Sequence, residues 1–219
     1  MARESKQRKA KESIALVVDG KDEKWYFERV KAHYPCDALK TTKIKPELPE
    51  RKKVQELFEF AKNKLAEGYT FVVLIIDMDE PLKNSREFAK FKELFIKYKL
   101  ARENKLVGRQ KTSYDWLKRI LVIINNPCLE YWYLLHYRKT TKFYPDYSSL
   151  YQELRKIPEF SHYEKCEAYY NNHPDIYERL EKNNGLENAK KNAIPFDLDI
   201  CKKQGCSEMN LIFDYFDRL

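Results

Sequence analysis

Carboxylates follow three short apolar runs of this sequence, at the points where each run ends. In chain order they are Asp19 and Glu23 after the first run, Asp77 and Asp79 after the second, and Glu130 after the third. Hard divalent cations such as Mg²⁺ and Mn²⁺ prefer oxygen ligands, usually one or two carboxylates with waters and phosphate oxygens. Clustered carboxylates repel one another and are stabilised by a cation, and a basic surround then attracts a phosphodiester. The pattern therefore predicts Mg- or Mn-assisted phosphoryl chemistry, with an ordinary turn at Asp19-Gly20 and a helix cap at Asp77 as the alternatives.

The three apolar runs are predicted to be buried strands of one parallel sheet. They cover residues 13–18 (SIALVV), 71–76 (FVVLII) and 120–124 (ILVII). Segments with helical periodicity separate them, and strands that alternate with helices indicate an α/β fold with parallel pairing. In such a sheet, ligands bind outside the carboxyl ends of the strands, which is where the carboxylates lie.

The elements around these runs complete the expected architecture. Residues 21–34, 49–65 and 85–101 are predicted to be helices, 36–44 a short strand, and 128–137 a buried aromatic helix. We expect an α/β core over residues 13–137 and a helical C-terminal part over residues 138–219, packed on the core. No strand is obvious in that part, where helices are expected at 147–154, 164–171, 175–192 and 210–219.

Charge and composition favour an anionic partner. The 219 residues include 42 Lys and Arg against 34 Asp and Glu, a net charge of +8, and nucleic acid is the commonest partner of a basic protein. Residues 1–12 are predicted to be a basic disordered tail. No apolar run approaches the roughly 20 residues of a membrane helix, and the first residues lack the apolar core of a signal peptide. A cytoplasmic protein without a membrane partner is therefore expected.

Two other site classes are disfavoured. Five cysteines without a CxxC pair favour reduced thiols over a disulfide framework or a zinc site. The absence of a glycine-rich phosphate loop argues against a small-molecule phosphotransferase.

Basic residues near the apolar runs are candidates for phosphate contacts. Lys21, which stands beside the first acid, is either a phosphate ligand in the site or an exposed lysine at a helix start. Lys105, Arg109, Lys111 and Lys118 lie in the connection that precedes the third run. We expect this connection to contact nucleic acid, with a solvated surface loop as the alternative.

The order of these motifs resembles the RloB family. The residues that carry the resemblance are Asp19, Gly20, Lys21, Glu23, Tyr26 and Phe27, then Asp77 and Asp79, then Asn126, Pro127, Cys128, Glu130, Trp132, Leu134, Leu135 and His136. The resemblance spans about residues 13 to 219, and the Asn-Pro-Cys-x-Glu segment is its most specific part. It implies a three-layer, parallel-sheet, Toprim-like core. It also implies a metal-dependent nuclease of antiphage, abortive-infection defence, often encoded with an ATPase partner.

The resemblance also implies roles for the acids. Asp77 and Asp79 would hold the metal, Glu130 would complete or orient the site, and Asp19 or Glu23 would handle proton transfer, with Glu23 also a possible ligand. The family usually has Glu where this chain has Asp19, and the loop that follows is shorter here. Asp19 therefore reaches one methylene less far than the presumed Toprim general acid/base.

Two functions stay open at this point. The first is a nuclease that acts on DNA or RNA, transfer RNA included. The second is a catalytically silent, Toprim-like subunit that binds nucleic acid or regulates a defence complex, which the shorter Asp19 and the positive charge both allow. A neighbouring ATPase and a second copy of the chain are the expected protein partners.

Overall fold

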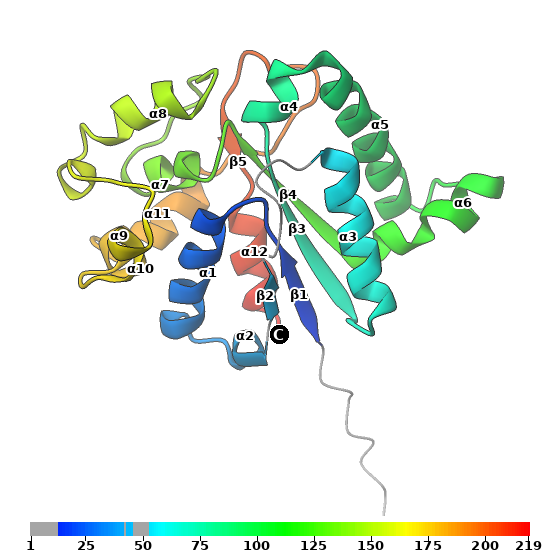
Figure 1. Cartoon of the computed structure of the whole chain (residues 1–219), viewed down its shortest axis with the longest axis horizontal. Helices are drawn as coiled ribbons and strands as arrows, with labels where there is room; N and C mark the ends of the chain where they lie inside the picture. Colours follow the sequence, from blue (N-terminus) through cyan, green and yellow to red (C-terminus); the bar gives the residue numbers. More distant parts are fainter. Residues whose placement is uncertain (1–12, 42, 46–52) are drawn as a thin grey trace, which may run out of the picture.

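A five-stranded sheet with helices on both faces organises the chain (Figure 1). The computed structural model describes residues 13–41, 43–45 and 53–219. The predicted basic tail, residues 1–12, lies outside the described residues.

The sheet has the order β2 (Lys43–Lys45), β1 (Ile14–Val17), β3 (Phe71–Asp77), β4 (Ile120–Asn126) and β5 (Cys206–Ser207). The first four strands are parallel, and β5 is antiparallel to β4. The parallel pairing predicted for the three apolar runs is therefore confirmed, with β3 between β1 and β4.

Helices cover both faces of the sheet, which explains why the runs in β1, β3 and β4 are apolar on both faces. One face packs against α3 (Val54–Ala66) and α5 (Ser85–Arg102). The other packs against α1 (Lys21–His33), α7 (Glu130–Tyr137) and α12 (Asn210–Phe216). Alternate residues of β3 belong to these two separate apolar clusters, as the period of two in a strand requires.

Shorter helices fill the connections. They are α2 (Asp37–Thr41), α4 (Asp79–Lys83), α6 (Gly108–Tyr114), α8 (Tyr147–Leu154), α9 (Glu167–Asn171), α10 (Ile176–Glu181) and α11 (Gly185–Asn192), with 3₁₀ turns at Asp115–Arg119 and Pro158–Phe160. Helices α8 to α10 follow one another beside α1 and α7 (Figure 1), and α11 packs on α7.

One expectation for the α/β part was wrong. Residues 36–44 do not form one strand, because α2 spans Asp37–Thr41 and β2 spans Lys43–Lys45. Asp37 pairs with Lys40 on the α2 turn, and Leu39 is wholly buried. The polar connection 102–119 contains α6, which buries none of its side chains and therefore carries no apolar periodicity.

The C-terminal part also differs from expectation in two places. The helix expected over 175–192 is divided into α10 and α11. Asn183 and Asn184 separate them with left-handed φ values of 55° and 62°, a conformation that asparagine tolerates better than most residues. The strand β5 was missed because two residues are too short for any pattern.

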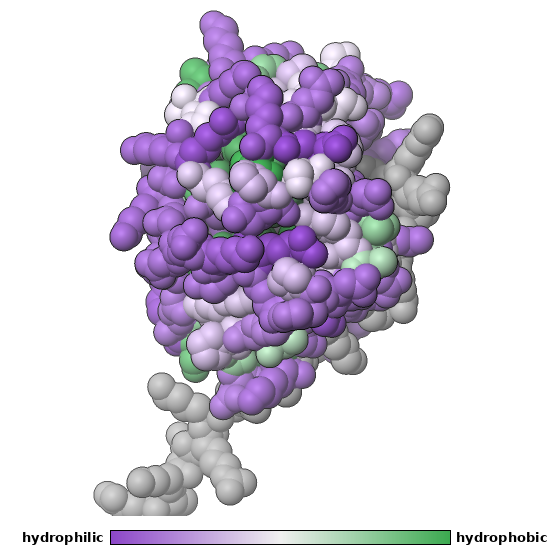
Figure 2. Space-filling model, turned by 90° about the vertical axis from the view of Figure 1, so that its left-hand side faces the viewer, coloured by the Kyte–Doolittle hydropathy of each residue, from purple (hydrophilic) through white to green (hydrophobic). Residues whose placement is uncertain are grey.

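The surface is mainly polar. The face in Figure 2 is largely hydrophilic, with small separate apolar patches. Across the described ranges, no helix combines the length and the apolar character needed to cross a membrane.

Candidate functional site

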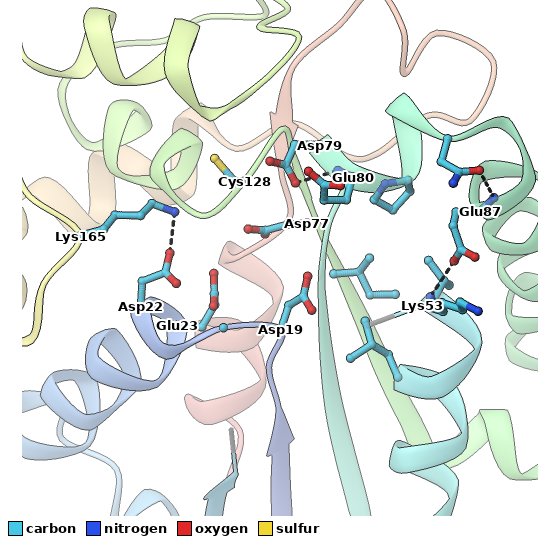
Figure 3. Close-up of a pocket in the computed structure, with 16 residues that line it drawn as sticks. Asp19, Asp22, Glu23, Lys53, Asp77, Asp79, Glu80, Glu87, Cys128 and Lys165 are labelled. Atoms are coloured by element: carbon cyan, nitrogen blue, oxygen red, sulfur yellow. Dashed lines mark hydrogen bonds and ion pairs between the residues drawn. The ribbon is translucent and has the colours of Figure 1, made fainter. Parts of the chain in front are cut away.

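A cavity of about 680 Å³ lies at the carboxyl ends of β1 and β3 (Figure 3). Its acidic lining residues are Asp19, Asp22, Glu23, Asp77, Asp79, Glu80 and Glu87. Four of the predicted site residues, Asp19, Glu23, Asp77 and Asp79, are among them. The structure thus brings together acids from two strand ends that are distant in the sequence.

The turn between β1 and α1 places two carboxylates over the backbone of Gly20. A Cβ at Gly20 would lie 2.8 Å from Oδ1 of Asp22 and 2.8 Å from Oε2 of Glu23. Both acids belong to the first turn of α1, where the helix dipole favours negative charge. A side chain at this position would therefore displace the two carboxylates.

Glu23 is the most enclosed of these acids. Its side chain is 2% exposed, and its Oε2 finds no hydrogen-bond partner among the described residues. A buried carboxylate oxygen without a partner is costly, and a cation ligand would remove that cost. Sequence reasoning identified Glu23 but missed its neighbour Asp22.

Asp77 is held in place by a chain of buried polar groups. Asn125 is its partner in the β3–β4 register, and the Asn125 amide donates to Asp77 Oδ1 at 3.2 Å. The N–H of Leu129 donates to Asp77 Oδ2 at 3.3 Å. Behind them, the Ser207 hydroxyl donates to Asn125 Oδ1 at 2.7 Å. Groups at the end of β4, in the turn after it and in β5 therefore fix the carboxylate that ends β3.

Asp79 reaches the cavity from a different element than Asp77. In an extended strand the two carboxylates of an Asp-x-Asp pair would point one way, because side chains alternate between the two faces. In the structure Asp77 ends β3 and Asp79 begins α4, so the sharp turn between them aims both at the cavity. The Pro127 carbonyl accepts the N–H of Asp79 at 3.0 Å and that of Met78 at 2.8 Å, which secures the turn.

The clustered acids raise one another's pKa. Burial raises the pKa of Glu23 well above its usual range, and the charges of Asp22 and Asp19 raise it further. Burial also raises the pKa of Asp77 well above its usual range, with Glu23 as the next cause. The pKa of Asp79 is raised by burial as well. A divalent cation would relieve this repulsion.

The donor chemistry fits a hard cation with few protein ligands. In the part of the chain that the structure describes, no three His, Cys, Asp or Glu side chains are grouped closely enough to hold a metal ion. Mg²⁺ commonly takes one or two carboxylates and completes its shell with waters and phosphate oxygens. Asp77 with Asp79 or Glu23 meets that requirement, and an all-oxygen set suits Mg²⁺ or Mn²⁺.

Lys165 brings a positive charge to the acidic wall. Its Nζ lies 2.7 Å from Asp22 Oδ2 and 2.9 Å from Glu130 Oε1, and it lines the cavity. Burial alone would lower the pKa of Lys165, but Glu130 and Asp22 raise it overall, so the ammonium stays charged. Sequence reasoning missed Lys165, because it lies between two short helices without any motif.

Glu130 faces Lys165 and is not among the described side chains that line the cavity. It is fully buried, and its Oε1 also accepts a hydrogen bond from the Tyr163 hydroxyl at 2.7 Å. This geometry fits the orienting role expected for Glu130 better than direct coordination. Cys128 does line the cavity, but burial raises the pKa of its thiol, which disfavours the thiolate form.

None of the five predicted basic residues belongs to the described lining of the cavity. Lys21 is exposed and does not belong to the described lining. Arg109 and Lys111 are exposed on α6, while Lys105 pairs with Glu103 and Lys118 with Asp115. The segment that carries Lys105, Arg109, Lys111 and Lys118 leads into the amino end of β4, whereas the acids lie at the carboxyl edge of the sheet. The seven residues of β4 span about 20 Å from one end to the other. The structure therefore separates this basic segment from the acids.

The chain matches a known protein family along most of its length. The family model described as RloB-like protein matches residues 14–214. No match is found among curated proteins or among solved structures. The chain belongs to the RloB-like family.

Proposed function

We propose that this member of the RloB-like family is a metal-dependent nuclease with a Toprim-like core, which cleaves DNA or RNA phosphodiesters in antiphage defence. One observation carries the proposal: buried, mutually repelling carboxylates from β1 and β3 line one cavity at the carboxyl edge of a mainly parallel sheet. The net charge of +8 supports a polyanionic substrate.

The acids divide into two roles in this proposal. Asp77 and Asp79 would hold Mg²⁺ or Mn²⁺, and the bound ion would neutralise phosphate charge and lower the pKa of a water. Glu23 is suited to proton transfer, because its raised pKa brings it nearer to neutral pH, where a general acid or base works best. Asp19 lines the same wall, one methylene shorter than the glutamate usual in the family.

Lys165 would bind the substrate phosphate. Its ammonium lines the cavity and is held by Glu130, which Tyr163 in turn holds. A fixed positive charge beside the reacting phosphate stabilises the charge that develops on its oxygens. Glu130 acts in this scheme as a positioning residue, through Lys165.

The test uses the purified chain with Mn²⁺ and labelled single-stranded and duplex DNA and RNA. We expect cleavage that Asp77→Asn with Asp79→Asn reduces by about 100-fold or more, and that Lys191→Ala, an exposed control, leaves unchanged. The assays are run with and without the ATPase encoded nearby, because family resemblance implies such a partner. Expression during phage challenge, with total RNA and DNA examined afterwards, identifies the target.

A second candidate is a catalytically silent subunit of a defence complex that binds nucleic acid or regulates it. Two features favour it: Asp19 is one methylene shorter than the glutamate usual in the family, and the net charge of +8 suits the binding of nucleic acid without cleavage. Metal titration separates the two functions. If Mn²⁺ neither raises the melting temperature nor quenches tryptophan fluorescence, and Asp77→Asn behaves in the same way, the silent subunit is favoured.

A further inference from the structure

The ammonium of Lys165 has a third contact besides the carboxylates of Asp22 and Glu130. Its Nζ lies 4.3 Å from the centre of the Tyr147 ring, in addition to 2.7 Å from Asp22 Oδ2 and 2.9 Å from Glu130 Oε1. A cation over the face of an aromatic ring is attracted by the quadrupole of that ring. Side chains from three separate helices, α1, α7 and α8, therefore hold one ammonium.

The Tyr147 ring is itself fixed in place. Tyr147 is the first residue of α8, and the side chain of Asp146 caps this helix by a hydrogen bond to its first turn. One turn further along α8, the Tyr151 ring packs on Tyr147 with 5.5 Å between the ring centres. The Tyr151 hydroxyl donates to the backbone carbonyl of Tyr163 at 3.3 Å, which ties α8 to the segment that carries Lys165.

A neutral ring holds a cation without adding negative charge. Burial and the charge of Glu130 raise the pKa of Tyr147, although Lys165 lowers it, so the phenol stays protonated at neutral pH. The ring therefore does not repel a phosphate, as a further carboxylate would. An ammonium has three N–H donors, and within the described part of the chain Asp22 and Glu130 take two of them. The third is left for a ligand in the cavity, which Lys165 lines.

We propose that Tyr147 is a positioning residue, whose ring holds the Lys165 ammonium in place for one phosphate oxygen in the cavity. This inference rests on the proposed function, in which Lys165 binds the substrate phosphate, and it adds a second residue of the C-terminal part to that site. A long, flexible lysine side chain loses much entropy when a ligand fixes it. Because the ring holds the ammonium before a phosphate arrives, that loss occurs on folding and does not weaken binding.

The alternative is that the Tyr147 ring only packs α8 against its neighbours. The two roles differ in what happens without the Lys165 ammonium. A ring that acts through the ammonium has no effect on phosphate binding once the ammonium is gone, whereas a packing effect persists. A double-mutant cycle of the two residues therefore distinguishes the two roles.

The test observes Lys165 and phosphate binding separately from cleavage. Protons over the face of an aromatic ring are shifted upfield in NMR spectra, so with ¹³C-labelled lysine we expect an upfield methylene signal that Lys165→Met lacks. Inorganic phosphate, with Mg²⁺ present, is the probe, and calorimetry measures its affinity. Tyr147→Leu should abolish the upfield shift and weaken phosphate binding about fivefold. Tyr147→Phe, which keeps the ring, should retain the shift and most of the affinity.

Three further variants control for packing. Tyr114→Leu removes another tyrosine ring that lies 4.3 Å from an ammonium, that of Lys97, and should change neither the Lys165 signal nor the phosphate affinity. Tyr147→Leu added to Lys165→Met should weaken phosphate binding no further than Lys165→Met alone. Tyr147→Met, which also lacks a ring, provides the same test if the leucine variant does not fold.

The outcomes separate this inference from the proposed function. The inference is overturned if Tyr147→Leu weakens phosphate binding further in the Lys165→Met background, or if the ring-free variants bind phosphate as the wild type does. A wild-type chain that binds no phosphate overturns it as well. A chain with ring-dependent phosphate binding that cleaves no nucleic acid keeps the inference and loses the nuclease. A chain that cleaves nucleic acid but binds phosphate independently of the ring keeps the nuclease and loses the positioning role.

Discussion

The ammonium of Lys165 lies 2.9 Å from the buried carboxylate of Glu130, although one residue belongs to the loop before α9 and the other begins α7. Through this pair the C-terminal part supplies the cation that faces the acids of the α/β part. Loss of this ion pair would therefore change both the stability of the fold and the charge balance of the cavity.

Lys165→Met should destabilise the chain by about 3 kcal/mol, because it leaves Glu130 charged, buried and without its cation. The side chain of Lys165 is about a third exposed, which keeps the loss at the low end of the range. Urea unfolding measures it. Glu130→Gln added to Lys165→Met should recover most of the loss, and a double mutant no more stable than the single one would show that the pair is not coupled.

The contribution of Glu23 and Asp77 to stability without metal should fall as the pH rises. The pKa values of Glu23 and Asp77 are raised in the folded state. Between the ordinary pKa and the raised one, the folded state therefore binds more protons than the unfolded state. Their contribution is fully present at low pH and is lost with rising pH, so the melting temperature with Mn²⁺ minus that without should grow with pH.

Asp77→Asn isolates this effect. Asn has one acceptor oxygen where Asp77 accepts two hydrogen bonds, so the variant loses a buried hydrogen bond at every pH, at a cost of about 1 kcal/mol. It also loses one repelling charge, a gain that grows with pH. The stability of the variant relative to the wild type without metal should therefore rise from low to neutral pH, and the variant should lose the response to Mn²⁺. A stability difference that is independent of pH would contradict the assignment.

Gly20→Ala should weaken metal binding clearly but change the free energy of unfolding little. Its Cβ would press on the carboxylates of Asp22 and Glu23 at 2.8 Å, while its φ of −136° suits alanine. We expect about tenfold weaker Mn²⁺ binding by calorimetry and a change in unfolding free energy below about 1 kcal/mol. Unchanged affinity would mean that these two acids lie outside the metal site.

Ser207→Ala should weaken metal binding from outside the cavity. Its hydroxyl donates to Asn125, whose amide holds Asp77, and loss of a buried hydrogen bond costs about 1–2 kcal/mol. We expect both the unfolding free energy and the Mn²⁺ affinity to fall. Ser149→Ala, which removes a hydroxyl on α8, serves as the control and should leave the Mn²⁺ affinity unchanged.

Arg109→Ala with Lys111→Ala tests the basic segment. If the two residues contact phosphates, binding of nucleic acid should weaken and the slope of log K against log salt should shrink by about 1.4 to 1.8. Mn²⁺ affinity should not change, because α6 precedes β4 while the acids follow β1 and β3. An unchanged slope would place the phosphate contacts elsewhere, most readily on the C-terminal helices.

The core of the site was predictable because its acids follow strong strand signals. Runs of buried β-branched residues locate β1, β3 and β4, and parallel pairing brings the acids after β1 and β3 to one edge. The role of Lys165 was not predictable, because only tertiary packing places this single loop lysine against Glu130. The short elements α2, α6 and β5 escaped for a related reason: each buries too few residues to impose a period.

The hydrogen bonds that support the cavity join residues far apart in the chain. Lys165 meets Asp22 across 143 positions, and Ser207 meets Asn125 across 82. Closing such long loops costs entropy that local contacts do not repay, so the cavity forms with the complete fold. A fragment over residues 13–137 would keep both acidic turns but lose the ammonium and the hydroxyl that hold them. A break in the backbone that releases the C-terminal part would therefore remove the supporting ammonium and hydroxyl from the site, although the acids after β1 and β3 would remain in their turns.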